Sequence, residues 1–123
     1  MALPAYTSYR FIRVTRPQPD IPIAHVELNR PEKLNAFSRP VWVEFGRVFR
    51  QISADADVRV VVLSGVGERA FTAGLDVAAE GMAMGGGGGG GDDGEDPARR
   101  AKGLRGHIEE FQGCISEMER CEK

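Results

Sequence analysis

The feature that most constrains the fold is a run of branched apolar residues at positions 58–63, which read Val-Arg-Val-Val-Val-Leu and are continuous from Val60. An apolar run without polar alternation is typical of a strand that is covered on both faces. An amphipathic helix is expected just before it, over residues 40–53, because apolar side chains recur there at the spacing of one helical face. A strand at 21–28 precedes that helix. The order strand, helix, strand with short connections predicts a βαβ unit and an α/β fold.

Two shorter patterns complete the first half of the chain. Residues 8–14 are rich in aromatic and β-branched side chains and predict a strand. The proline-containing segment 16–20 predicts a turn, so this strand is expected to pair as a hairpin with the alternating strand at 21–28. Ser38 is expected to be the N-cap of the following helix, with Pro40 in its first turn.

The second half begins with a segment of different composition. Seven consecutive glycines, at positions 85–91, lose much backbone entropy on ordering, so residues 81–96 are expected to be a flexible Gly/Asp-rich insertion. Asp96 and Pro97 are typical of a helix start, and apolar residues at helical spacing predict an amphipathic helix that runs to about Arg120. The expected organisation is therefore a ββαβ portion (1–80), the insertion (81–96) and a helix (97–123).

Composition and charge exclude several classes of protein. The chain has 123 residues, a one-domain length, and its 16 basic and 18 acidic residues give a formal net charge of −2. No block of like charges indicates nucleic-acid binding, and no apolar stretch approaches the roughly 18 residues of a membrane span. No targeting segment is recognised in residues 1–16. Cys114 and Cys121 would lie roughly 10 Å apart on a helix, too far for a disulfide, which favours reduced thiols in an intracellular compartment.

Two segments carry a more specific pattern. Residues 31–36 read Pro-Glu-Lys-Leu-Asn-Ala, and residues 71–76 read Phe-Thr-Ala-Gly-Leu-Asp, after the valine-rich strand and its glycine. In this order the two motifs resemble the enoyl-CoA hydratase/isomerase, or crotonase, family. Within that family the chain looks most similar to dienoyl-CoA isomerases. The resemblance covers residues 8–78 and 97–123 but not the glycine run, and it implies the N-terminal part of a crotonase-like ββα spiral fold.

The resemblance implies a site for an acyl-CoA thioester. Backbone N–H groups fixed around the thioester oxygen stabilise the enolate that forms when a proton is removed. By carry-over, the N–H of Leu75 would be one of the two oxyanion donors, and Thr72, Ala73, Gly74, Leu75 and Asp76 would line the CoA site. Lys33 and Leu34 would lie near the adenosine-phosphate end. No metal and no separate cofactor are implied, because CoA arrives as part of the substrate.

The acids that move protons in the family cannot be assigned in this chain. Glu109, Glu110, Glu117 and Glu119 are interpreted as the solvated face of the second helix. We therefore expect the chain to be the acyl-CoA-binding part of a fatty-acid β-oxidation isomerase and to be inactive alone. An enoyl-CoA hydratase is the alternative among enzymes, and a non-catalytic fragment that binds acyl-CoA or full-length subunits is the alternative of another class. The family resemblance also implies a mitochondrial or peroxisomal homo-oligomer, a trimer or hexamer.

Other motifs have plainer interpretations. The segment 65–70 matches a loose dinucleotide-binding pattern, but no helix is expected to open there, so a turn is favoured. The acids at 92–96 lack the spacing of a calcium loop. His25 and His107 have no paired ligand or base at helical or strand spacing, and both are interpreted as structural.

Overall fold

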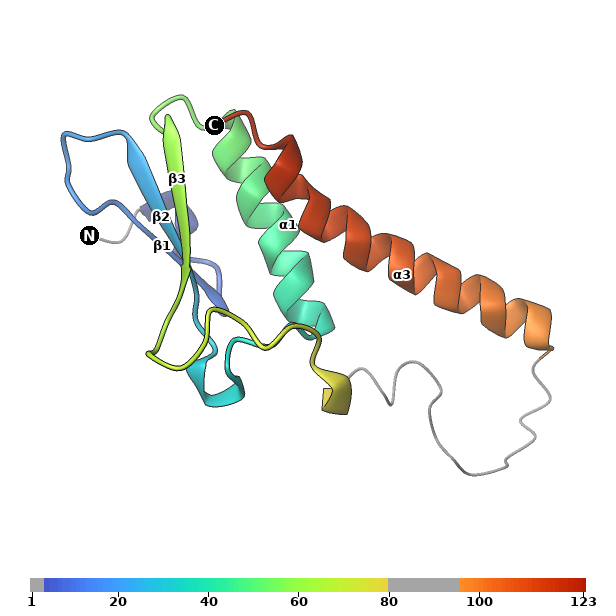
Figure 1. Cartoon of the computed structure of the whole chain (residues 1–123). Coiled ribbons are helices and arrows are strands. Elements are labelled where there is room, and N and C mark those ends of the chain that lie inside the picture. Colours follow the sequence, from blue (N-terminus) through green and yellow to red (C-terminus); the bar gives the residue numbers. More distant parts are fainter. Residues whose placement is uncertain (1–3, 80–95) are drawn as a thin grey trace.

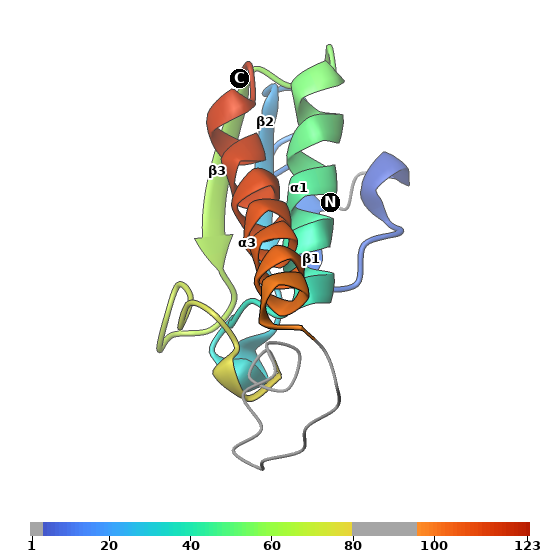
Figure 2. The ribbon, with the colours of Figure 1, turned by 90° about the vertical axis from the view of Figure 1, so that its right-hand side faces the viewer.

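The computed structural model describes residues 4–79 and 96–123, which form a small sheet with helices on one side (Figure 1). The strands are β1 (Ile12–Thr15), β2 (Ile23–Leu28) and β3 (Val60–Gly65), in the order β1-β2-β3. The helices are α1 (Arg39–Ala54) and α3 (Pro97–Arg120), with short 3₁₀ turns η1 (Pro4–Tyr6) and η2 (Pro31–Lys33). The views in Figures 1 and 2 place α1 against the sheet and α3 against α1.

The sheet has the expected connectivity. Strands β1 and β2 pair antiparallel, with Val14 opposite Val26, so the hairpin prediction is confirmed. Strands β2 and β3 pair parallel, with Val26 opposite Leu63, and α1 lies between them in sequence. This is the βαβ unit that the sequence predicts. The first strand begins later than expected, because the N–H groups of Arg10 and Phe11 donate to the Glu44 carboxylate, each at 2.7 Å.

The core lies between the sheet and α1. Alternation along β2 turns Ala24, Val26 and Leu28 toward the helix, and all three are buried. The facing side of α1 contributes a set of residues at helical spacing that are fully or almost fully buried: Val41, Trp42, Phe45, Val48, Phe49 and Ile52. The helix predicted from periodicity is therefore confirmed. Ser38 is its N-cap residue, but its side chain makes no capping hydrogen bond.

One expectation about the valine-rich strand is wrong for this chain. Its composition predicts a strand covered on both faces, but β3 lies at the edge of the sheet, and Val60 and Val62 are 49% and 45% exposed. The physical reason is that both long helices lie on one side of the sheet, so the side that carries Val60 and Val62 has no covering layer among the described residues. Only Val61 and Leu63, on the helix side, pack against the core.

Helix α3 packs on α1 from His107 onward. Phe111 and His107 meet the Trp42 ring edge-on, with centroids 4.8 and 5.3 Å away, and Cys114 lies over Gly46. Asp96 caps the helix by accepting a hydrogen bond from the Ala98 N–H, as expected. Leu104 and Ile108, which belong to the predicted apolar face, remain 37% and 40% exposed, because the N-terminal part of α3 diverges from α1 (Figure 1).

Three further predictions concern the insertion, the cysteines and membrane spans. Apart from Asp96, the insertion at 81–96 lies outside the described residues. Cys114 and Cys121 are free thiols, and both are partly buried. Among the helices described, none combines the length and apolarity that crossing a membrane requires.

Candidate functional site

The two motif segments, about 40 residues apart in the sequence, lie against each other in the structure. Phe37 and Leu75 form a parallel β-bridge. In it the Phe37 N–H donates to the Gly74 carbonyl at 2.7 Å, and the Asp76 N–H donates to the Phe37 carbonyl at 2.8 Å. The Ala73 N–H adds a hydrogen bond to the Leu34 carbonyl at 2.9 Å. The structure thus brings the predicted residues 72–76 next to the predicted Leu34.

The buried side chain of Asn35 holds the two motif segments together through hydrogen bonds. Its side chain is 2% exposed, accepts from the Arg30 N–H at 2.9 Å, and donates to the carbonyls of Val66 at 3.0 Å and Ala70 at 3.3 Å. Burial without such partners would cost roughly 1–3 kcal/mol for each unsatisfied group. A β-carbon on Gly65 would lie 2.7 Å from the Asn35 amide nitrogen, so the strand must end in glycine here. The sequence pattern indicates Asn35 only as part of a motif and does not reveal this role.

Thr72 sets the conformation of the turn that follows. Its hydroxyl donates to the Asn35 carbonyl at 2.7 Å and accepts from the Gly74 N–H at 3.0 Å. Gly74 has a φ of +84°, a conformation that is strained for residues with a β-carbon. The hydroxyl and the glycine together fix the direction in which the backbone enters Leu75.

The backbone N–H of Leu75 is left without a partner within residues 4–79 and 96–123. In a parallel bridge of this kind, Phe37 uses both its N–H and its C=O toward the neighbours of Leu75. The N–H and C=O of Leu75 itself therefore point to the opposite side. Leu75 is 39% exposed, and the β-carbon position of Gly74 has open space around it.

The Asp76 carboxylate forms hydrogen bonds within the protein. Its carboxylate accepts a hydrogen bond from the Arg30 guanidinium at 2.8 Å and from the Ala79 N–H at 3.1 Å. Both partners in the ion pair have side chains less than one-fifth exposed, at 17% for Arg30 and 11% for Asp76. The Arg30 hydrogen bond is the main reason that the pKa of Asp76 lies below its ordinary value, and the charge of Lys33 contributes to the same shift. Arg30 is not among the site residues predicted from the sequence.

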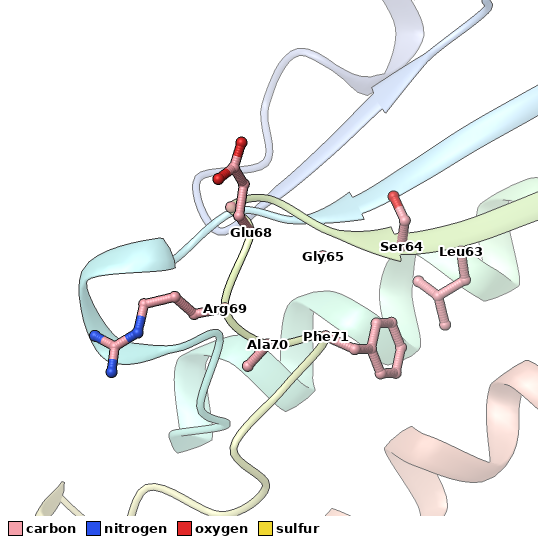
Figure 3. Close-up of a pocket in the computed structure, with 8 residues that line it drawn as sticks. Leu63, Ser64, Gly65, Glu68, Arg69, Ala70 and Phe71 are labelled. Carbon is pink, nitrogen blue, oxygen red and sulfur yellow. The ribbon is translucent and has the colours of Figure 1, made fainter.

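Two shallow hollows lie beside the segment that joins β3 to this turn. One is lined by residues of 63–71 and is shown in Figure 3, where the Phe71 ring and the Arg69 guanidinium extend in different directions. The other, of about 440 Å³, lies between η2 and residues 66–70 and includes Leu34 and Arg69 in its lining. Of the predicted residues only Leu34 lines either of these two hollows; Lys33 and residues 72–76 do not.

Arg69 and Phe71 line the first hollow but are not among the site residues predicted from the sequence, although Phe71 begins the second motif. The described residues contain no group of three or more His, Cys, Asp and Glu side chains that could hold a metal ion.

Comparison with known proteins identifies the fold and then the family. A solved enoyl-CoA hydratase/carnithine racemase from Magnetospirillum magneticum superposes with a TM-score of 0.71 at 25% identity, over 96% of this chain and 38% of that chain. The fold is thus of the crotonase type, as expected. The sequence model of the enoyl-CoA hydratase/isomerase family matches residues 20–88, so the chain belongs to this family. Enzymes of the family act on CoA thioesters, in which CoA is part of the substrate.

Relatives with curated names agree with the subfamily resemblance. The mitochondrial Delta(3,5)-Delta(2,4)-dienoyl-CoA isomerase of Mus musculus is 40% identical over 119 residues, which cover 94% of this chain and 33% of that protein. The peroxisomal enzyme of the same name from Arabidopsis thaliana is 31% identical over 94% of this chain and 40% of its own length. The chain therefore spans only about a third of the length of the curated relatives it matches.

Proposed function

We propose that this chain forms the acyl-CoA-binding portion of a fatty-acid β-oxidation isomerase that acts on dienoyl-CoA thioesters. The names of the Mus musculus and Arabidopsis thaliana relatives support the substrate class. The single observation that carries the proposal is the N–H of Leu75, which faces away from Phe37 in their β-bridge and follows the positive-φ turn at Gly74.

The proposed role of Leu75 follows from the chemistry of thioesters. Removal of a proton beside the thioester carbonyl moves negative charge onto its oxygen, and the Leu75 N–H donates a hydrogen bond to that oxygen. The donor needs little reorganisation, because the Phe37–Leu75 bridge and the Thr72 hydroxyl already hold the turn. Removing one such donor costs enzymes on the order of 10²–10³ in kcat.

The rest of the CoA molecule would lie along the two hydrogen-bonded motif segments, 31–36 and 71–76. The Gly74 carbonyl already accepts from Phe37, so the adenine amine would use another carbonyl of residues 72–76. Lys33 and Leu34 would lie near the adenosine phosphates. Arg69, in the lining of the hollow that also contains Leu34, supplies a further positive charge for phosphate. In this proposal Asp76 positions the turn through Arg30 rather than contacting the ligand with its carboxylate.

We further propose that the 123-residue chain does not turn over substrate by itself. Three of the four acids of α3 form ion pairs: Glu109 with Arg105, Glu110 with Arg39, and Glu117 with Arg50 and Arg120. The fourth, Glu119, is exposed. In this proposal none of the four is the proton-transfer group. Mitochondrial or peroxisomal localisation, supported by the names of the relatives, and assembly as a trimer or hexamer stay predictions.

Nuclear magnetic resonance of the backbone amides tests the proposed donor directly. Titration with a crotonyl-CoA thioester should shift the Leu75 amide proton downfield, since a carbonyl acceptor engages it. Free CoA, which lacks that carbonyl, should shift the residues around Lys33 and Arg69 but leave Leu75 unchanged. An identical Leu75 response to both compounds would contradict the oxyanion role but leave CoA binding intact.

A matched pair of variants distinguishes the contribution of the Leu75 backbone N–H from that of the Leu75 side chain. Leu75→Pro removes the N–H, whereas Leu75→Ala keeps it, and neither touches the hydrogen bonds of the Phe37 bridge. We expect Leu75→Pro to bind the thioester no more tightly than free CoA, and Leu75→Ala to keep a preference for the thioester. Thermal unfolding by circular dichroism establishes that both variants are folded. Equal thioester preference in the two variants would refute the assignment.

The hydratase alternative is supported by the similarity to the solved enoyl-CoA hydratase/carnithine racemase from Magnetospirillum magneticum. It differs in its product, because a hydratase adds water to an enoyl-CoA and removes its conjugated absorbance, while the isomerase moves a diene into conjugation with the thioester carbonyl. Incubating the chain with each substrate distinguishes the two. We expect neither change with this chain alone; formation of the carbonyl-conjugated diene at enzymatic rates would overturn the proposed inactivity and support the isomerase.

A further inference from the structure

The direction of the Leu75 N–H is a property of one peptide plane. In a trans peptide, the C=O of one residue and the N–H of the next residue point in opposite directions. The Gly74 C=O accepts a hydrogen bond of 2.7 Å from the Phe37 N–H. The Leu75 N–H therefore faces away from Phe37 only as long as the Gly74 C=O faces toward it. A rotation of this plane would turn the Leu75 N–H toward Phe37.

Gly74 by itself does not resist such a rotation. Glycine lacks the β-carbon that restricts the backbone of other residues, and a β-carbon built at Gly74 would meet no atom within 4 Å. Its φ of +84° must therefore be held by hydrogen bonds. One is the Phe37 bond to its C=O, and the other is the bond that its N–H donates to the Thr72 hydroxyl at 3.0 Å. These two bonds fix the peptide planes on either side of Gly74.

The Thr72 hydroxyl has its proton engaged inside the protein. A hydroxyl group offers one donor and two acceptor positions. The Thr72 proton is donated to the Asn35 C=O at 2.7 Å, and one acceptor position takes the Gly74 N–H. The hydroxyl therefore links Gly74 to Asn35, and it has no proton left to donate to a ligand.

Asn35 gives this link a fixed base. Its side chain is 2% exposed, and its amide group forms hydrogen bonds to the backbone of Arg30, Val66 and Ala70. The Asn35 N–H adds a bond of 2.9 Å to the Arg30 C=O. The backbone of Asn35 has a φ of +55°, a conformation that asparagine adopts more readily than most residues. Together these bonds hold in place the Asn35 C=O that receives the Thr72 proton.

We propose that Thr72 and Asn35 are positioning residues for the thioester oxygen. The Asn35 C=O and the Thr72 hydroxyl hold Gly74 in the conformation that keeps the Leu75 N–H directed away from Phe37. Both residues act through the backbone of the turn, and neither contacts the ligand with the polar group of its side chain. The inference rests on the proposed function of Leu75 and adds the residues that determine the direction of its amide.

A matched set of threonine variants tests the proposal by calorimetry. Thr72→Val replaces the hydroxyl with a methyl group of similar size and should weaken crotonyl-CoA binding by roughly two- to tenfold, the net contribution of one hydrogen bond. Binding of free CoA should not change. Thr72→Ser keeps the hydroxyl and should retain the thioester affinity of the unmodified chain. Thr7→Val is the control, because the Thr7 hydroxyl also donates to a backbone carbonyl, that of Pro4 at 3.0 Å, but lies outside the motif segments.

Asn35→Gly tests the base of the link. Glycine adopts the left-handed backbone of Asn35 without strain, so the variant removes only the amide side chain. It should lower the affinity for crotonyl-CoA relative to free CoA, as Thr72→Val does. Circular dichroism establishes whether the variant is folded. If it is not, the Thr72 variants decide, because they leave the side-chain hydrogen bonds of Asn35 in place.

Nuclear magnetic resonance of the Leu75 amide separates the outcomes. In Thr72→Val its signal should broaden, because the peptide plane exchanges between orientations, and its shift on addition of crotonyl-CoA should be reduced. A thioester response that persists in full in Thr72→Val, or that is lost in Thr72→Ser or Thr7→Val, would refute the positioning role alone. The absence of any thioester-specific response in the unmodified chain would instead overturn the proposed function of Leu75, and this inference with it.

Discussion

Gly74 and Gly103 have the same open space at the position of a β-carbon but differ in backbone conformation. Gly74 has a φ of +84°, whereas Gly103 lies within α3 and its φ is outside the positive range. Gly74→Ala should therefore lower the free energy of unfolding by about 1–2 kcal/mol through backbone strain. Gly103→Ala should raise it by about 1 kcal/mol, because alanine favours a helix. Urea unfolding of the two variants measures both changes, and equal effects would show that backbone conformation at residue 74 does not limit the turn.

At the scale of elements, the contact between α1 and α3 depends on the absence of a side chain at Gly46. A β-carbon there would lie 3.1 Å from the Cα of Cys114, whereas Gly113 on the other helix has open space. Gly46→Leu should force the helices apart and lower stability by about 1–3 kcal/mol. Gly113→Leu is the matched control and should be close to neutral or stabilising. Near-ultraviolet circular dichroism of Trp42, which contacts Phe111 across this interface, should change only in Gly46→Leu. A change in both variants would contradict this account.

For the whole molecule, the titrating groups predict a stability that falls at both extremes of pH. Hydrogen bonds from Tyr6, Arg13 and Arg30 hold the pKa values of Asp55, Glu27 and Asp76, respectively, below the ordinary values of 3.8 for Asp and 4.5 for Glu. Because these pKa values are lowered on folding, the stability they provide is present above pH of about 5 and is lost as pH falls through the folded values.

The alkaline side has the opposite sign. Burial, reinforced by Asp55, raises the pKa of Tyr6 above its ordinary value of 10.0, and burial also raises that of Tyr9. Their contribution is complete below pH of about 10 and is lost as pH rises toward the folded pKa values. Urea unfolding across pH should give a plateau between these limits. Tyr6→Phe removes the phenol and its 2.7 Å hydrogen bond to Asp55. It should therefore make the free energy of unfolding depend less steeply on pH on both the acid and the alkaline side of the plateau. Unchanged slopes on both sides would refute this coupling.

Local chemistry in the sequence determined the elements and their order. The periodicity of α1, the alternation in β2 and the cap at Asp96 are properties of neighbouring residues, so they could be predicted without knowing what those residues contact. The two motifs also indicated the family, which the comparison confirms. The assignment of Leu75 and residues 72–76 as ligand contacts rests on resemblance and stays a prediction.

Only the tertiary structure decided which groups are occupied and which are free. The carboxylate of Asp76 is engaged by Arg30, 46 positions away, and the amide of Asn35 joins loops that lie 31 and 35 positions along the chain. The position of β3 at an edge likewise depends on where the helices lie, although its composition is that of an interior strand. These contacts depend on long-range packing and on which residue of a β-bridge makes its hydrogen bonds. Neither is encoded in the local order of residues, so the sequence could suggest the Leu75 amide only by resemblance, and its place opposite Phe37 in the bridge required the tertiary structure.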